Sequence, residues 1–247
     1  MALQFNDTTN KNGIIQQLEQ ALSFNDGDIS GNATRLAMFT GDINLGVDEV
    51  TAMILSADRS RQIDDYNHTK YPIITIDVVS GQRDYSFTED EQLNLIVHIH
   101  KVMCADSSGV LKDLQAVNQQ DSGTANDSFN DGNATAGVPY RYDKTADGIF
   151  LDPIPNYAST AGLKIFIDRE ASHFTVSDTT KKAGFMSLFH EYLVLKPAYR
   201  YARDKSLPNA TALKRDMLEM RQYITDHIQR NQSSVKQGLR VNQQFNR

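Results

Sequence analysis

Two histidines, His98 and His100, stand two residues apart in a run of β-branched and apolar residues. Side chains alternate along a β-strand, so both imidazoles are expected on one face. Such a pair can ligate zinc when further donors converge on it, but the sequence offers no third ligand at a suitable spacing. We interpret both as ordinary strand residues and keep a small metal-dependent hydrolase as the lesser alternative.

Neighbouring carboxylates and a single thiol offer other chemistry. Asp64 and Asp65 could bind a metal or act as acid and base, and residues 25–28 resemble part of a calcium loop. Neither place has the remaining ligands, so we predict a solvated helix end at the first and a turn at the second. Cys104 could act as a nucleophile, but burial as a structural residue is commoner for cysteine.

The sequence contains no motif of a known catalytic machinery. A phosphate-binding loop, Gly-x-Ser-x-Gly and a dinucleotide fingerprint are all absent. His190-Glu191 does not belong to a zincin motif, because Val194 occupies the position of the second histidine. We therefore predict that the protein is not an enzyme and has no cofactor and no metal.

Composition narrows the class further. The chain has 247 residues, a net charge of −6 and one cysteine, so an intrachain disulfide is excluded. The first residues lack a signal peptide's charged and apolar regions, and no run approaches the roughly 20 apolar residues that span a bilayer. These features predict a protein that folds in a cytoplasm, has no membrane partner and is no obvious nucleic-acid binder.

The first half of the chain predicts helices followed by strands. Apolar residues recur at helical spacing over 14–22 and, as one long stripe, from Leu36 to Ala57. Gly41 and Gly46 within this stripe are compatible with a kink or the close approach of another helix, but we predict a slightly bent core helix. Strands are expected over 73–79, 84–87, 95–103 and 110–114, the first two as a hairpin around Ser80-Gly81-Gln82.

The second half begins with a polar, acidic stretch and ends in helices. The polar, acidic composition of residues 118–136 predicts a long loop. Three short strands follow, the last with Leu163, Ile165 and Ile167 on its buried face and Lys164, Phe166 and Asp168 opposite. Ser187 is expected to cap a helix bent at Pro197, and Ser206-Leu207-Pro208 to end it and start the next.

These elements predict an α+β fold: a helical bundle from N- and C-terminal helices with a central antiparallel β region. We expect residues 1–70 and 170–232 to form one helical domain and 71–169 an inserted β domain. Residues 233–247 are expected to form an extended tail rich in basic residues and glutamine. Such a tail can fold on a partner, contact nucleic acid or remain disordered.

Two short passages carry a resemblance to a known family. They are Gly137-Val138-Pro139-Tyr140-Arg141-Tyr142 and Gly148-Ile149-Phe150-Leu151-Asp152-Pro153-Ile154-Pro155, followed by a strand and the helix entry at 184–190. In this order they resemble the head-to-tail adaptor (connector, neck, tail-tubular) proteins of tailed bacteriophages. The likeness extends loosely over residues 65–230.

The resemblance implies a structural virion protein at the head–tail interface, assembled in the host cytoplasm. Such proteins form a ring, usually of twelve copies, that docks on the portal, extends the DNA channel and provides the platform for the next neck or tail protein. Packaged DNA would pass through the lumen without sequence-specific binding. The residues we expect to bind the portal or tail lie in the C-terminal segment: Val235, Lys236, Leu239, Arg240, Val241, Phe245 and Arg247.

Other functions stay open at this point. A different neck or tail protein, a stopper or a tail terminator, would share the β region but use another partner. A nucleic-acid binder would use the basic tail, which carries four Arg and Lys residues and no acid from Gln229 to Arg247.

Overall fold

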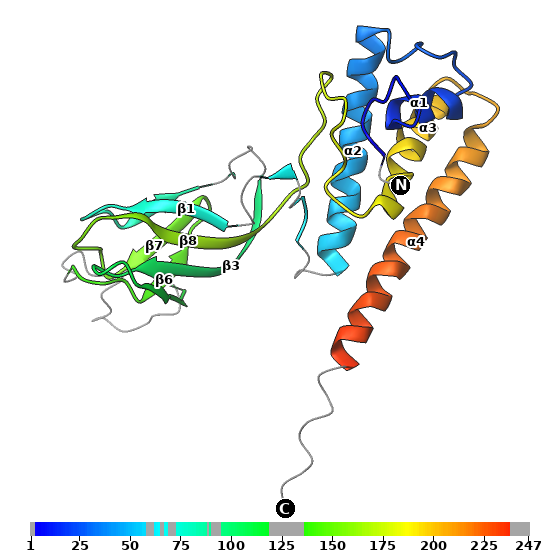
Figure 1. The fold of residues 1–247 in the computed structure, drawn as a ribbon. Helices are drawn as coiled ribbons and strands as arrows, with labels where there is room; N and C mark the ends of the chain where they lie inside the picture. The colour runs from blue at the N-terminus through cyan, green and yellow to red at the C-terminus, as the bar shows by residue number, and fades with distance from the viewer. Residues whose placement is uncertain are drawn as a thin grey trace, which may run out of the picture. The chain divides into compact units, whose positions relative to one another are not determined.

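The computed structural model describes residues 3–57, 62–64, 67–68, 73–87, 89, 95–118 and 136–237, with side chains as far as residue 230. The chain divides into two compact units (Figure 1). Residues 1–67 and 171–247 form a helical unit, and residues 68–170 form a β unit. The α+β class predicted from the sequence is confirmed.

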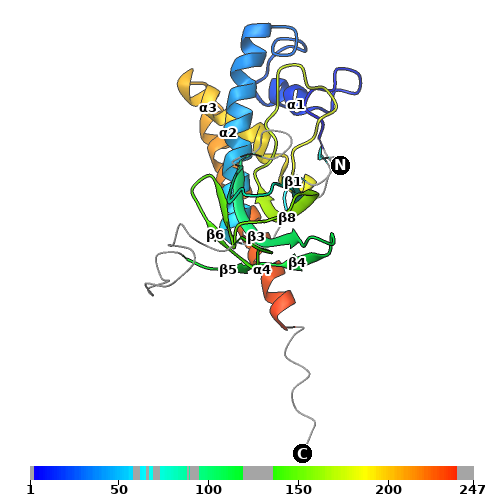
Figure 2. The same ribbon diagram turned by 90° about the vertical axis from the view of Figure 1, so that its left-hand side faces the viewer.

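The helical unit contains the long helices α2 (Ala33–Ala57) and α4 (Ala210–Gln237) and the shorter α1 (Ile14–Ala21), η2 (Ser187–Phe189) and α3 (Tyr192–Asp204). Helix α3 packs against α1, α2 and α4 (Figures 1 and 2). The stripe predicted along α2 is confirmed as its core face, with these residues buried: Leu36, Phe39, Ile43, Val47, Val50 and Ile54.

Two details of the C-terminal helices differ from the sequence prediction. Ser187 caps no helix: it begins the short 3₁₀ turn η2, and α3 begins only at Tyr192. Pro197 lies inside α3 as expected. The chain stops and restarts near Ser206, but Ser206 has a positive φ of 53° and α4 begins later, at Ala210.

The β unit consists of two four-stranded sheets, with strand orders β1-β8-β3-β4 and β2-β7-β6-β5. Its strands are β1 (Ile73–Val78), β2 (Asp84–Ser86), β3 (Ile96–Ala105), β4 (Leu111–Asp113), β5 (Gln115–Ala116), β6 (Arg141–Lys144), β7 (Gly148–Asp152) and β8 (Ser159–Arg169). All pairings are antiparallel except that of β5 with β6. Side chains from both sheets share one core, which includes Tyr85, Val102, Tyr142, Leu151 and Ile165.

The predicted hairpin between β1 and β2 is wrong. The turn forms, with Gly81 at a φ of 79°, but β1 pairs with β8 whereas β2 pairs with β7 in the other sheet. The Tyr85 ring is buried in the core of the β unit, and its hydroxyl accepts a hydrogen bond from the Val79 amide at 3.0 Å. A local turn signal predicts that the chain reverses direction, but it does not determine which strand the next strand pairs with.

Candidate functional site

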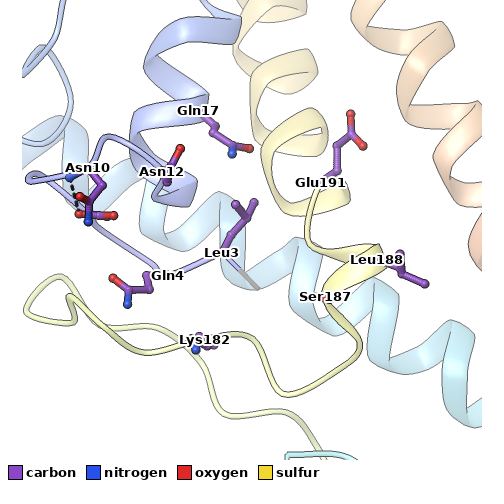
Figure 3. Close-up of a pocket in the computed structure, with 10 residues that line it drawn as sticks. Leu3, Gln4, Asn10, Asn12, Gln17, Lys182, Ser187, Leu188 and Glu191 are labelled. Atoms are coloured by element: carbon purple, nitrogen blue, oxygen red, sulfur yellow. Dashed lines mark hydrogen bonds between the residues drawn. The ribbon is translucent and has the colours of Figure 1, made fainter. Parts of the chain in front are cut away.

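One recess in the helical unit is lined mainly by residues with polar side chains and has a volume of about 810 Å³. Figure 3 shows its lining side chains, which come from the N-terminal segment, α1 and the approach to α3. The lining residues are Leu3, Gln4, Asp7, Asn10, Asn12, Gln17, Lys182, Ser187, Leu188 and Glu191. Four of them are amides, which both donate and accept hydrogen bonds.

Backbone pairing between distant segments builds one wall of this pocket. Gln4 forms an antiparallel bridge with Lys182, and the Phe5 amide donates to the Lys181 carbonyl at 2.8 Å. The Phe5 ring stacks on Phe174, with ring centroids 4.8 Å apart. Two segments far apart in the sequence therefore meet here, which is why no local sequence pattern indicated the pocket.

Asp7 fixes the loop that carries the amide residues. Its Oδ1 accepts hydrogen bonds from the amides of Thr9 at 3.2 Å and Asn10 at 2.9 Å, the second drawn in Figure 3. The backbone hydrogen bond from Asn10 lowers the pKa of Asp7, against a smaller opposing effect of desolvation. The side chain is therefore ionised at neutral pH and places a negative charge at the pocket.

His190 contacts the pocket-lining residue Leu3 and is engaged through both ring nitrogens. Its Nδ1 accepts the Leu3 amide and its Nε2 contacts the Phe185 carbonyl, both at 3.1 Å, so Nε2 must carry the proton. Burial lowers the pKa of His190, against the opposing effects of those two contacts. Both ring nitrogens are occupied, so His190 cannot act as a base for Ser187. The pocket is suited to hydrogen bonding rather than to nucleophilic chemistry.

The two histidines of β3 contact each other, and one of them pairs with a buried carboxylate. The imidazoles of His98 and His100 meet edge to face with centroids 5.0 Å apart, and His100 Nε2 lies 2.7 Å from Asp168 Oδ1. No group of three or more histidine, cysteine or acidic side chains within the described ranges could hold a metal. Asp168 is buried, whereas Lys164 and Phe166, predicted on the same face of β8, are half-buried.

Cys104 is a buried structural residue in the β core. Burial raises the pKa of its thiol, against a smaller opposing effect of the contact with the Tyr157 hydroxyl 3.7 Å away. The Tyr157 hydroxyl itself donates to the Ala105 carbonyl. A thiol with a raised pKa stays protonated and is a poor nucleophile, which agrees with the structural interpretation.

Asp64 is not the solvated helix end predicted from the sequence. It is buried, and its Oδ2 accepts the Ser172 amide at 2.7 Å and the Ser172 hydroxyl, while its Oδ1 accepts the Asn67 amide group. Its own amide donates to the Gly184 carbonyl at 2.8 Å. Asp64 therefore acts as a clamp: it holds the end of the first helical segment to residues 172 and 184 of the second. Asp65 lies outside the described residues.

The acidic stretch at 25–28 is a turn, as predicted, but no local pattern indicated the residue that organises it. Buried Glu19 on α1 accepts the Ile29 and Ser30 amides through Oε1, both at 2.8 Å. Asp28 closes the turn by accepting the Asn25 amide at 2.9 Å. A charged residue on a helix is usually solvated, so no local signal distinguished this one.

The predicted partner-binding residues lie at and beyond the end of α4. Helix α4 continues to Gln237, so residues 233–237 are helical rather than extended. The backbone at Val235 and Lys236 belongs to this helix, although their side chains lie outside the description. Leu239, Arg240, Val241, Phe245 and Arg247 lie outside the described residues.

The chain matches no protein-family model and no curated protein sequence. Among the described residues, no helix combines the length and apolar character needed to cross a membrane.

Proposed function

We propose that this chain is a structural virion protein, the head-to-tail adaptor of a tailed bacteriophage. Copies of it would form a ring, of twelve by the family resemblance, that docks on the portal and extends the DNA channel. The ring would also provide the platform for the next neck or tail protein. The proposal begins from the two sequence passages that resemble this family, and the following features support it.

The observation that carries the proposal furthest is the construction of the helical unit from both ends of the chain. Residues 1–67 and 171–247 make one compact body, and the β unit is a single insertion. One core is shared by α1, α2, α3 and α4. A ring needs a rigid body with two different contact surfaces, since head-to-tail contacts must close. The inserted β unit then supplies a separate surface for another partner.

The end of α4 is the proposed point of attachment to the portal. This helix runs on to Gln237 and leads into the segment with Leu239, Val241 and Phe245 as apolar anchors. Arg240 and Arg247 add positive charge to a chain of net charge −6. A segment of this composition can order on binding, while the acidic body lets DNA slide past rather than stick.

Portal binding by a shortened chain tests this proposal. The full chain and a chain ending at Gln237 are each mixed with portal rings of the same phage, and the mass of the complexes is measured. We expect the full chain to add several copies per portal ring and the shortened chain to remain folded by circular dichroism but fail to bind. A full chain that stays monomeric and ignores the portal contradicts the proposal.

A further inference from the structure

Helix α2 carries a second, outward face that lacks the charges expected of a solvated helix. Directly opposite its core face, these residues are exposed: Thr34, Met38, Gly41, Leu45, Asp48 and Ala52. The side chains of Met38 and Leu45 are 45% and 46% exposed. A surface helix normally has charged residues opposite its core stripe, but this face has only Asp48, which lies 2.6 Å from His173 Nε2 of the same chain.

The spacing of this outer face suits packing against another helix. Its residues are separated alternately by four and three positions, the spacing of the seam in a two-helix coiled coil. The side chains therefore form one line along α2, which at 25 residues is about 37 Å long.

The two glycines of α2 differ in a way that points to an external contact. A Cβ at Gly46 would lie 3.3 Å from Leu193 Cδ2, so α3 explains that glycine. A Cβ at Gly41 would have no heavy atom within 4 Å. A glycine inside a helix costs about 1 kcal/mol relative to alanine, and packing within this chain gives no reason for Gly41. A bare backbone on an outer face allows a second helix to approach closely.

Charges beside the outer face are already paired within the chain. Asp42 lies 3.0 Å from Arg200, and Glu49 pairs with Lys196 on α3. These groups are therefore engaged, and the outer face offers its partner mainly apolar and small side chains. A partner surface with many charges would lose their hydration without compensation.

Helix α4 has a face of matching character. It comprises Thr211, Lys214, Leu218, Gln222, Thr225 and Gln229. Leu218 is 47% exposed, and Lys214 is the one formal charge of this face. The neighbouring Arg215 is paired with Asp216 at 3.0 Å. At 28 residues α4 is long enough to cover the outer face of α2.

We propose that a second copy of this chain covers the outer face of α2 with the Thr211–Gln229 face of its α4. Such a contact uses two different surfaces and is therefore head-to-tail, so its repetition builds a ring when the rotation closes. The inference that the partner is a second copy of this chain rests on the proposed adaptor function. The place of the contact is inferred from the outer face of α2 and the Thr211–Gln229 face of α4.

Gly41→Glu tests whether the contact between copies lies on the outer face of α2. Ala212→Glu, on an exposed side of α4 away from the proposed contact, is the matched control. Since space around Gly41 is open, Gly41→Glu is expected to fold with an unchanged or higher melting temperature at low concentration. We expect it to lose assembly, measured by sedimentation at rising concentration and with portal rings, while Ala212→Glu assembles like the parent chain. Assembly of Gly41→Glu at the parent level overturns the proposed contact but leaves the adaptor function standing.

Cross-linking tests the identity of the two faces. Gly41→Cys and Gln222→Cys chains are mixed and treated with a short bismaleimide, with the parent chain, whose single Cys104 is buried, as background. We expect mixed dimers well above the yield of either variant alone. Cross-links only between Gly41→Cys copies indicate a symmetric α2–α2 contact and overturn the proposal, as does the absence of any cross-link. A parent chain that never assembles, even on portal rings, contradicts the proposed adaptor function as well.

Discussion

At the scale of single residues, the helical unit depends on buried polar side chains that join segments distant in sequence. Asp64 fastens residues 172 and 184 to the end of the first helical segment. Glu19 holds the turn before α2, and His190 ties the N-terminal segment to the approach of α3. Removing one partner of such a contact leaves buried donors unsatisfied, which costs more than the bond itself contributes.

Asp64→Ala is therefore expected to lower the free energy of unfolding by about 2–4 kcal/mol, because the donors of Ser172 and Asn67 lose their acceptor. Asp26→Ala is the control: Asp26 is exposed and pairs with Lys11 at 2.7 Å on the surface, a contact worth about 1 kcal/mol or less. Urea unfolding of both variants provides the measurement. Equal small losses would show that Asp64 is not a clamp.

His190 predicts a pH dependence of stability. Burial lowers its pKa in the folded chain below the value of about 6.5 expected when unfolded. Between these two values the unfolded chain binds more protons, so stability is complete above about pH 6.5 and falls as the pH drops toward the folded pKa. Urea unfolding at about pH 7.5 and about pH 5 should show this loss.

His190→Gln separates this effect from the other acidic groups. The variant is expected to be less stable overall at neutral pH, since the contacts with Leu3 and Phe185 change. Its loss of stability between the two pH values should be smaller than that of the parent chain. An identical pH dependence would show that another group titrates in this window.

At the scale of elements, the two glycines of α2 provide a matched pair. Gly41→Leu faces open space and is expected to keep or raise the stability of the monomer, by up to about 1 kcal/mol from helix propensity. Gly46→Leu must displace Leu193 and is expected to destabilise by about 1–3 kcal/mol. Thermal unfolding at low concentration measures both. Equal effects would contradict the assigned packing of α2.

Elements with long periodic patterns could be predicted from the sequence, and pairings between them could not. The stripe from Leu36 to Ile54 identified α2 and its core face, because helical periodicity is a local property. The partner of β1 is β8, more than 80 residues further along the chain, and no turn signal encodes it. The polar pocket escaped prediction for the same reason, since it joins residues near 4 and 182.

At the scale of the whole molecule, the basic tail allows a test of the nucleic-acid alternative. DNA is titrated with the full chain and with a chain ending at Gln237, at several salt concentrations. We expect equally weak binding by both chains. Contacts between the tail and DNA phosphates would instead appear as a steep salt dependence of the full chain's affinity. This outcome fits a tail that binds protein. A salt slope that is steep for the full chain and flat for the shortened one would identify the tail as a DNA-binding arm.

The proposed function requires copies of this chain to assemble as a ring on the portal. Electron microscopy of the full chain with portal rings of the same phage, beside each component alone, tests it most directly. We expect an added annular layer on the portal with an open central channel and a mass corresponding to about twelve copies, the number the resemblance implies. Portal rings that remain bare while this chain stays monomeric would contradict it.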